Sequence, residues 1–375
     1  MISFEVLEGR EAIKQYYPQW EGLLASASHE SSLSIPWTEA LLDSYIEGSL
    51  ILIVLTDSAG IAGLVPLYVK ETKRQGMSLL TLSPVAEHFN THSDLLLRDS
   101  SAELTEAFLK AVLSVRVKWD VFRINRFVIG HPLLQSLEYA LKNKRNYAYR
   151  IQSEEPSFFV KVGNSKDEYP KAVSGKFRHN VRSYLNKLRA AGEVSFRSIH
   201  DLADFDKAFD TMLRIEEASW KHKHGTGISS TEKSRRFYKE LCSGELKYGR
   251  LRVAMLYLNQ TPIAYEMGLV NGKKYYSVHG SYDENYKKNS PGVVLLAQCI
   301  DGLMQEGIEE LDFFGEPFEW QQNWTDKYRW HRSILIYNRN WKAKCFQLVT
   351  RLKSTLKPAK EDKLVLRNPR DITPG

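Results

Sequence analysis

The first half of the chain alternates short apolar runs with polar turns, a pattern that predicts a meander of strands. The run LILIVLT at residues 50–56 is followed by Asp57-Ser58-Ala59-Gly60, which is typical of a turn. Apolar residues at positions 104, 108, 109, 112 and 113 predict an amphipathic helix over residues 103–118. The other elements predicted in this half are strands at 61–69, 77–83 and 120–125 and a helix near 131–144.

The same order of elements recurs about 195 residues later. The predicted strands are residues 251–258, 262–270, 274–282 and 310–314. Between the last two lies a helix over 291–306, with Pro291 in its first turn and Gly307 after its end. The repetition predicts an α/β protein with mixed (α+β) sheets, built from two copies of one unit. Two unrelated α+β domains with similar meanders are the alternative.

A basic amphipathic helix is predicted between the two copies, over residues 176–191. One face carries apolar residues at 177, 181, 184, 185 and 188, and the other carries Arg178, Arg182 and Arg189. This basic face is either simply solvated or contacts the phosphate groups of a ligand.

Several motifs of the second copy resemble a GNAT-type acyltransferase domain. They are PIAYEMGLV (262–270), YYSVHGSYDENYKKNSPGVVLL (275–296), ELDFFG (310–315), RWHRS (329–333) and EEASWKHKHG (216–225). The chain most resembles the CelD-like acetyltransferases of cellulose biosynthesis, which pair two GNAT-like folds as Fem-type aminoacyltransferases do. The resemblance implies two tandem GNAT-like folds. The expected domains are 1–155, 156–340 with the donor site, and a basic tail at 341–375.

The resemblance also implies a donor site for acyl-CoA, with acetyl-CoA as the simplest case. In GNAT folds, the coenzyme A pyrophosphate binds at a helix N-terminus, where free N–H groups and the helix dipole favour an anion. The corresponding segment here is Ser290-Pro291-Gly292-Val293-Val294, with Lys287 and Lys288 just before it. We expect Ser290 to cap the helix and Gly292 to allow close approach of a phosphate. The segment has fewer glycines than the usual GNAT loop, so an ordinary helix start is the alternative.

Acyl transfer needs a base that takes the acceptor's proton. His279 lies near a strand end, and Asp283 just beyond it could orient the imidazole. Strict alternation along 275–282 would place Ser277 and His279 on one face. Glu266 interrupts an apolar strand, where a carboxylate must face solvent, find a partner or line a cleft with a raised pKa. His279 and Glu266 are therefore alternative candidate bases, and a structural role is open for each.

Three further positions are candidates for contacts with the acceptor. Glu217, Trp220 and Lys221 are spaced to share a helix face, and the resemblance implies that they line the acceptor cleft. Glu316 follows the last strand of the copy, and Trp324 belongs to an aromatic-rich stretch that suits a sugar ring or adenine. A core tryptophan beside a surface ion pair, and an aromatic lid packed on the core, are the structural alternatives.

Charge and composition narrow the partners. The net charge is +7, but nine of the 52 Lys and Arg and only three of the 45 acidic residues lie after Trp341, so residues 1–340 carry +1. A nearly neutral body argues against nucleic acid as a partner. The basic tail is either a solubilising extension or a contact for an anionic membrane. No apolar run spans a bilayer, and the three cysteines lie far apart, so we expect a cytoplasmic protein without disulfides or metal.

The function expected from the resemblance is an acyl-CoA-dependent N- or O-acyltransferase. Its acceptor would be a sugar, an amino sugar or another polar metabolite, in exopolysaccharide or envelope biosynthesis. A Fem-like aminoacyltransferase that uses charged tRNA is one alternative. A GNAT-fold partner protein without catalytic activity is another.

Overall fold

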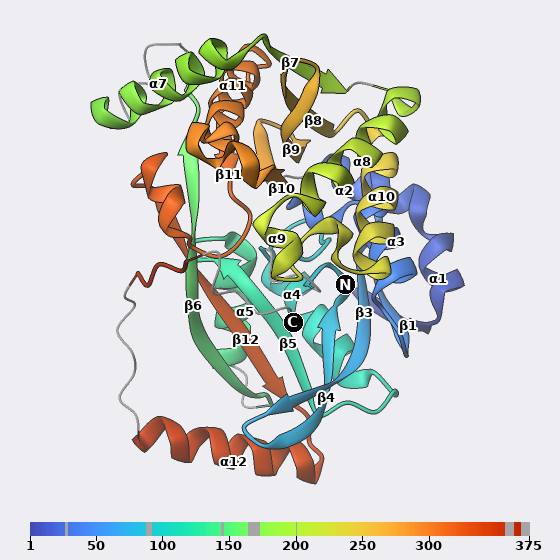
Figure 1. Ribbon diagram of the computed structural model, residues 1–375. Helices are drawn as coiled ribbons and strands as arrows, with labels where there is room; N and C mark the ends of the chain where they lie inside the picture. The colour runs from blue at the N-terminus through green and yellow to red at the C-terminus, as the bar shows by residue number, and fades with distance from the viewer. Residues whose placement is uncertain are drawn as a thin grey trace. The chain divides into compact units, whose positions relative to one another are not determined.

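The two copies of the sequence pattern form two units in a computed structural model of the chain (Figure 1). One unit comprises Met1–Pro156 and Trp330–Leu364, and the other comprises Ser157–Arg329 and Val365–Gly375. The residues that the structure describes are 1–26, 29–87, 92–143, 146–163, 173–199, 201–356 and 364–368.

The first unit begins with a strand, three helices and a three-stranded meander, followed by a helix, a strand and a helix. These elements are β1 (Ser3–Glu8), α1 (Arg10–Gln15), α2 (Tyr17–Ser26), α3 (Ile35–Ser44), β2 (Leu50–Asp57), β3 (Gly60–Arg74), β4 (Met77–Pro84), α4 (Ala102–Ser114), β5 (Val121–Val128) and α5 (Pro132–Asn143). Ser34 and Ser101 start α3 and α4 by accepting hydrogen bonds from backbone N–H groups of the first turn.

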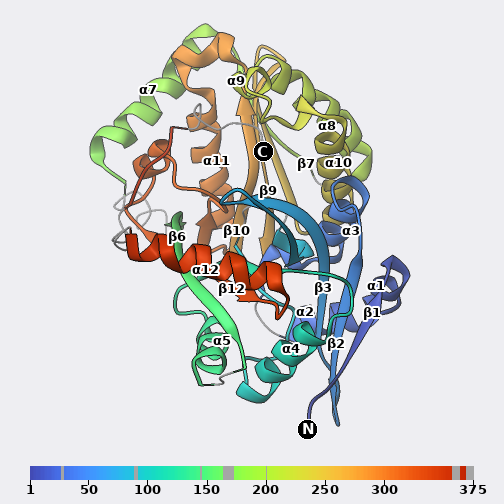
Figure 2. The same cartoon turned by 90° about the horizontal axis from the view of Figure 1, so that it is seen from below.

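The second unit has the same order of elements after an additional helix, α7 (Gly175–Ala191). Its elements are β7 (Val194–Ile199), α8 (Leu202–Glu217), α9 (Trp220–Lys223), α10 (Glu232–Lys247), β8 (Leu251–Leu258), β9 (Thr261–Asn271), β10 (Lys274–Tyr282), α11 (Pro291–Gln305) and β11 (Glu310–Asp312). The α8 and α10 helices cover one face of the β8–β9–β10 meander, and α11 covers the other, with α7 packed on α11 (Figures 1 and 2).

Strand pairing confirms the predicted fold class, a mixed α/β architecture that repeats one unit. In the first unit, β1 to β4 pair antiparallel in sequence order, and β4 then pairs parallel with β5. In the second unit, β7 to β10 pair antiparallel in sequence order, and β10 then pairs parallel with β11. A parallel pair after an antiparallel meander needs a crossover, which α4 and α11 supply.

Each sheet is completed by a strand from the opposite half of the chain. The end of β6 (Ala148–Lys161) pairs with β11, and β12 (Tyr328–Tyr337) pairs with β5. The first segment of the first unit ends at Pro156, next to the expected boundary, and the unit also includes the segment from Trp330. The segment from 341, whose apolar residues at 346, 348, 349 and 352 predict a surface helix before a basic extension, begins as α12 (Trp341–Leu356). Its Ala343 and Phe346 are buried in a core cluster of the first unit. No helix in the described parts of the chain is long and apolar enough to span a bilayer.

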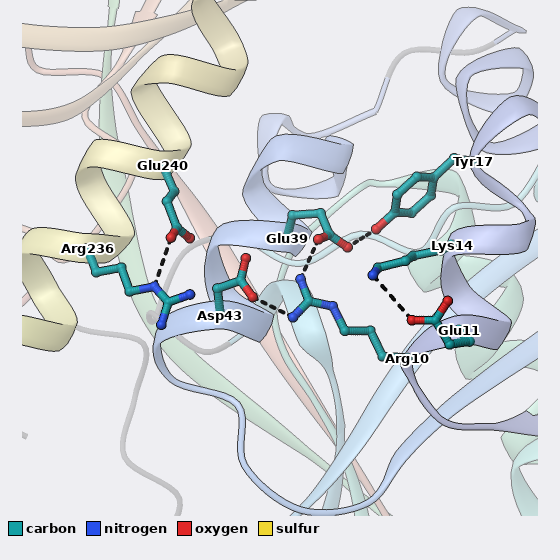
Figure 3. A network of polar contacts seen from close by, with 8 residues as sticks. All are labelled: Arg10, Glu11, Lys14, Tyr17, Glu39, Asp43, Arg236 and Glu240. Carbon is teal, nitrogen blue, oxygen red and sulfur yellow. Dashed lines mark hydrogen bonds and ion pairs between the residues drawn. The ribbon is translucent and has the colours of Figure 1, made fainter. Parts of the chain in front are cut away.

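A half-buried network of ion pairs and hydrogen bonds joins the first helices of the first unit (Figure 3). The Arg10 guanidinium of α1 donates to the carboxylates of Glu39 and Asp43 on α3. The Tyr17 hydroxyl of α2 donates to the second carboxylate oxygen of Glu39. These contacts raise the pKa of Arg10 further above its usual range, Asp43 having the largest effect. Arg10 thus joins α1 to α3, and Tyr17 joins α2 to the same carboxylate of α3.

We predict that the meander of the second unit tolerates no side chain at Gly268. A Cβ there would lie 2.2 Å from the Tyr276 carbonyl oxygen and 2.4 Å from the Tyr275 ring. Gly268→Ala should therefore lower the free energy of unfolding by about 1–3 kcal/mol. Gly302→Ala on α11 is the matched control, because nothing lies within 4 Å of its Cβ position. It should stabilise the protein by about 0.5–1 kcal/mol. Urea denaturation tests both, and equal midpoints would contradict the prediction.

Candidate functional site

The central feature of the second unit is that β10 and β11 separate soon after they begin. They pair only at Lys274–Tyr276 with Glu310–Asp312, whereas β10 continues to Tyr282. The Asp312 carboxylate accepts the Phe314 N–H at 2.8 Å, and Phe314 adopts a left-handed φ of 50°. This turn directs the chain away from β10. One edge of β10 beyond Tyr276 therefore has no strand partner among the described residues.

The paired end of the two strands is held by buried charges. Arg329 lies 2.7 Å from a carboxylate oxygen of Glu310 and 3.3 Å from one of Asp312, and Lys161 lies 3.1 Å from Glu310. Burial alone would raise the pKa of Glu310, but Arg329 outweighs this effect and lowers it. The separation of β10 from β11 thus starts at a fixed point.

A β-bulge in β10 changes which side chains share a face. Ser277 pairs with Gly268 and His279 with Met267, so Val278 is the extra residue. As a result, Ser277 lies on the face of Glu266, and His279 lies on the opposite face with Tyr265. The strict alternation expected from the sequence, with Ser277 and His279 on one face, was wrong for this reason.

Glu266 lies against the unpaired part of β10. Its carboxylate accepts hydrogen bonds from the hydroxyls of Ser277 at 2.6 Å and Tyr275 at 3.4 Å. A Cβ on Gly280, the residue opposite, would lie 2.2 Å from the Glu266 carboxylate oxygen, so a side chain at this position would displace the carboxylate. Burial raises the pKa of Glu266 to about 7, and the hydrogen bond from Ser277 and the charge of Lys221 limit the rise.

A second buried network occupies the other face of the same strands. The Tyr265 hydroxyl lies 2.7 Å from Glu216 Oε1 and 2.9 Å from His279 Nδ1, and Glu216 Oε2 accepts the Ile228 N–H at 3.0 Å. Burial raises the pKa of Glu216, but the nearby His279, the charge of Lys221 and the hydrogen bond from Tyr265 lower it overall. The Tyr265 hydroxyl donates to the Glu216 carboxylate, and the Thr226 backbone is a second hydrogen-bond partner of His279.

His279 is a weak base in this environment. Burial and the charge of Lys221 lower its pKa to about 3, so its imidazole is neutral at pH 7. Its hydrogen-bond partner is Tyr265, not Asp283 as we expected from the sequence. The Asp283 carboxylate instead accepts the Asn285 N–H at 2.9 Å, at the start of a short 3-10 helix, η4 (Glu284–Asn289).

Glu216 and Tyr265 are the site residues that the sequence analysis missed. Glu216 continues the buried stripe of α8, four residues after Met212, and a helical stripe that ends in a carboxylate was the available signal. Tyr265 lies in a largely apolar strand, β9, and the sequence around it does not indicate that its hydroxyl has a polar role. Glu217, the neighbour chosen from the sequence, is exposed.

Lys221 is brought to β10 by a break in the helix. Helix α8 ends at Glu217 and α9 begins at Trp220, so the expected single helix face across 217–221 does not form. Lys221 Nζ donates to the Gly280 carbonyl oxygen at 2.5 Å. Trp220 is partly exposed and its ring lies edge-on to that of His224, 5.7 Å between centroids.

The expected donor segment follows the unpaired end of β10. Ser290 stands at the N-cap of α11 with a left-handed φ of 45° and without a side-chain capping bond, unlike the hydroxyl cap that we expected. Its carbonyl oxygen accepts the N–H groups of Val293 at 3.0 Å and Val294 at 3.2 Å. A Cβ on Gly292 would lie 3.3 Å from the Tyr282 ring, so this turn packs closely on the end of β10. Pro291 is buried in the first turn, and Lys288 is exposed in η4.

Most of the second unit matches a known protein family in sequence. Residues 175–322 match the acetyltransferase (GNAT) domain family. The second unit therefore contains a GNAT-type acetyltransferase domain. The match includes the helices α7 to α11, the β8–β9–β10 meander and β11, and with them Glu216, Lys221, Glu266, His279 and Asp312. Arg329 and Lys161 lie outside the match. No curated protein matches the chain.

Solved structures share the fold over nearly the whole chain. FemX is 12% identical, with a TM-score of 0.58 over 92% of this chain and 99% of that chain. The C-terminal domain of a putative lysylphosphatidylglycerol synthetase from Agrobacterium fabrum is 11% identical, with a TM-score of 0.56 over 90% and 96%. A conserved protein of unknown function from Bacteroides thetaiotaomicron is 12% identical, with a TM-score of 0.60 over 90% and 100%. At these identities the similarity shows the fold alone.

Two of the expected acceptor contacts lie apart from this network within the GNAT-type unit. Glu316 forms an ion pair with Arg367 at 2.6 Å. Trp324 is 2% exposed and lies edge-on to Phe177 of α7, so it contributes to the core. Among the described residues, no group of His, Cys, Asp and Glu is arranged to hold a metal ion.

We predict that ionisation of Glu266 destabilises the fold. Because its folded-state pKa is about 7, above the usual 4.5, the folded state binds more protons between these values, and stability falls as pH rises. Glu266→Gln removes this cost and should stabilise the protein by roughly 3 kcal/mol at pH 8 but little at pH 4.

Urea denaturation of both proteins at pH 4 and pH 8 measures the effect. Glu217→Gln is the matched control, because this carboxylate is exposed and should show no such difference. A gain in stability for Glu266→Gln that is the same at both pH values would contradict the prediction.

Proposed function

We propose that the protein is an acyl-CoA-dependent acyltransferase that acylates an amine of a polar metabolite. The observation that carries the proposal is the early separation of β10 from β11, just before the N-terminus of α11, with the carboxyl group of Glu266 at the unpaired stretch. A donor bound along this edge would have its phosphates at the helix and its thioester near a titratable carboxyl group.

The donor half of the proposal rests on the surroundings of α11. The first turn of a helix offers free N–H groups and the positive end of the dipole, which suit a pyrophosphate. Lys287 and Lys288 lie in η4, directly before this turn. Helix α7 packs on both α11 and η4 and contains basic residues but no Asp or Glu. An extended pantetheine arm could then hydrogen-bond along the unpaired edge of β10, as an added strand does.

The acceptor half rests on the different environments of the two candidate bases. A carboxyl group with a pKa of about 7 is well matched to remove a proton from an ammonium group near neutral pH. His279 lies on the opposite face of β10 with a pKa of about 3, so it removes protons poorly. Glu266 is therefore our candidate general base, which favours N-acylation over O-acylation. His279 serves in this proposal to orient Tyr265.

The acceptor class follows from the CelD-like resemblance in the sequence. It suggests an amino sugar or a related polar amine, used in exopolysaccharide or envelope biosynthesis. Since acyl-CoA is made and used in the cytoplasm, we propose that the reaction takes place there.

We predict that the donor pyrophosphate contacts the first turn of α11. Gly292→Glu adds bulk next to Tyr282 and a negative charge beside the phosphates, so acetyl-CoA affinity should fall at least about tenfold. Gly302→Glu makes the same change in the same helix, where nothing lies within 4 Å, and should leave affinity unchanged. Isothermal titration calorimetry measures both. Equal affinities of the two folded variants would reject this placement.

The same titration of the parent protein separates the alternatives. Saturable heat with acetyl-CoA supports the acyltransferase. Binding of charged tRNA without acetyl-CoA would support a Fem-like aminoacyltransferase. Binding of neither would support a GNAT-fold partner protein.

We predict that Glu266→Gln lowers kcat by about 10²–10⁴-fold and leaves acetyl-CoA binding intact, because only the proton acceptor is lost. In the parent protein, kcat/KM should rise with pH through a group that titrates near pH 7. Thiol release from acetyl-CoA with glucosamine as the first acceptor measures both. His279→Ala is the companion variant. If it loses activity and Glu266→Gln stays within a few-fold of the parent, the base is misassigned.

A further inference from the structure

Lys221 places a cation at the edge of β10 that β11 leaves open. In an antiparallel pair, every second residue directs its N–H and C=O toward the neighbouring strand. The Asp283 N–H donates to the Ile263 carbonyl of β9 at 2.9 Å, so Gly280, three residues earlier, directs its N–H and C=O away from β9. The Lys221 ammonium donates to that C=O at 2.5 Å, so it lies at the open edge.

The main chain around Lys221 is tied to the end of β10. The Glu284 N–H donates to the Ala218 carbonyl in the α8–α9 break at 3.2 Å. The Lys221 carbonyl accepts the N–H groups of His224 at 3.2 Å and Thr226 at 3.0 Å. These bonds hold the short α9 helix against the strand, so the ammonium is preorganised beside Gly280.

Two carboxylates balance the charge of this ammonium. Glu216 approaches from one face of the strands and Glu266 from the other, and both favour the charged form of Lys221. Burial acts more strongly and lowers the pKa of Lys221. An ammonium group has three N–H donors, and Gly280 uses one of them.

We propose that Lys221 stabilises the oxyanion that forms on the thioester carbonyl of the donor. This inference rests on the acyltransferase function proposed above. Glu266 first takes a proton from the acceptor ammonium, and the free amine then attacks the carbonyl carbon, so that the C=O electron pair moves to the oxygen beside the Lys221 ammonium. The carbonyl re-forms as the C–S bond breaks, and the departing thiolate takes the second proton of the nitrogen. Glu266 then releases its proton to solvent.

The backbone of β10 explains why a cation is needed beside Gly280. Gly280 presents a carbonyl oxygen on the open edge, and its partial negative charge would repel an oxyanion. The Lys221 ammonium neutralises that carbonyl and offers its remaining N–H groups. Donors fixed before the reaction, in a site screened from water, stabilise a developing charge most effectively.

Infrared spectroscopy of bound acetyl-CoA tests this inference without an acceptor. The probe is acetyl-CoA labelled at its thioester carbonyl, and a polarised carbonyl absorbs at lower frequency than the free thioester. We expect this shift in the parent protein, its loss in Lys221→Met, and its retention in Lys221→Arg. Lys223→Met is the matched control, because Lys223 is an exposed lysine of α9 paired with Glu284 and should keep the shift.

The outcomes separate the inference from the proposed function. A parent protein that fails to bind acetyl-CoA would reject the function and the inference together. Binding without a carbonyl shift in the parent would reject only the role of Lys221, whether or not Lys221→Met folds. A shift that survives in Lys221→Met would reject it as well. With glucosamine, Lys221→Met should lower kcat about 10²–10³-fold at nearly unchanged acetyl-CoA affinity, which a purely structural lysine would not do.

Discussion

The Asp312 carboxylate ends β11 after three residues, and the candidate site depends on this early end. By accepting the Phe314 N–H, Asp312 turns the chain away from β10. Arg329 holds both carboxylates of β11 at the paired end, so the strands separate at one fixed place. Beyond it, β10 keeps β9 as a neighbour on one side and presents its backbone groups on the other. An unpaired strand edge is normally a liability, but here it is short and has the half-buried Lys221 beside it.

The charges around this edge show how one cation supports two carboxylates in opposite states. Lys221 lowers the pKa of both Glu216 and Glu266, and burial raises both. Glu216 also has His279, a tyrosine hydroxyl and a backbone N–H nearby, so its pKa falls below the usual value. Among the described residues, Glu266 accepts hydrogen bonds only from the hydroxyls of Tyr275 and Ser277, so burial has the largest effect on its pKa and raises it. The neighbouring groups and the hydrogen-bond donors together therefore distinguish the Glu216 carboxylate from that of Glu266.

The repeated order of strands and helices could be predicted from apolar periodicity and turn residues, because these patterns are local. Glu266 was also accessible, since a carboxylate inside an apolar strand is unusual in any context. The bulge at Val278 and the helix break before Trp220 were not accessible from the sequence. The bulge decides the face of His279, and the break decides where Lys221 points. Both depend on pairing with distant segments, which a single sequence does not display.

The exchange of strands between the two halves of the chain is a feature that local sequence patterns did not predict. β12 pairs with β5 in the first unit, although about 200 residues separate them in sequence. The end of β6, which continues directly from the first unit, instead borders β11 in the second. Removing the C-terminal segment would uncover the buried β5 strand, and removing the N-terminal half would take away the chain that leads into β6. Such non-local pairing costs loop-closure entropy, which is offset only when the distant strands have formed their contacts. Each unit is therefore complete only in the full chain.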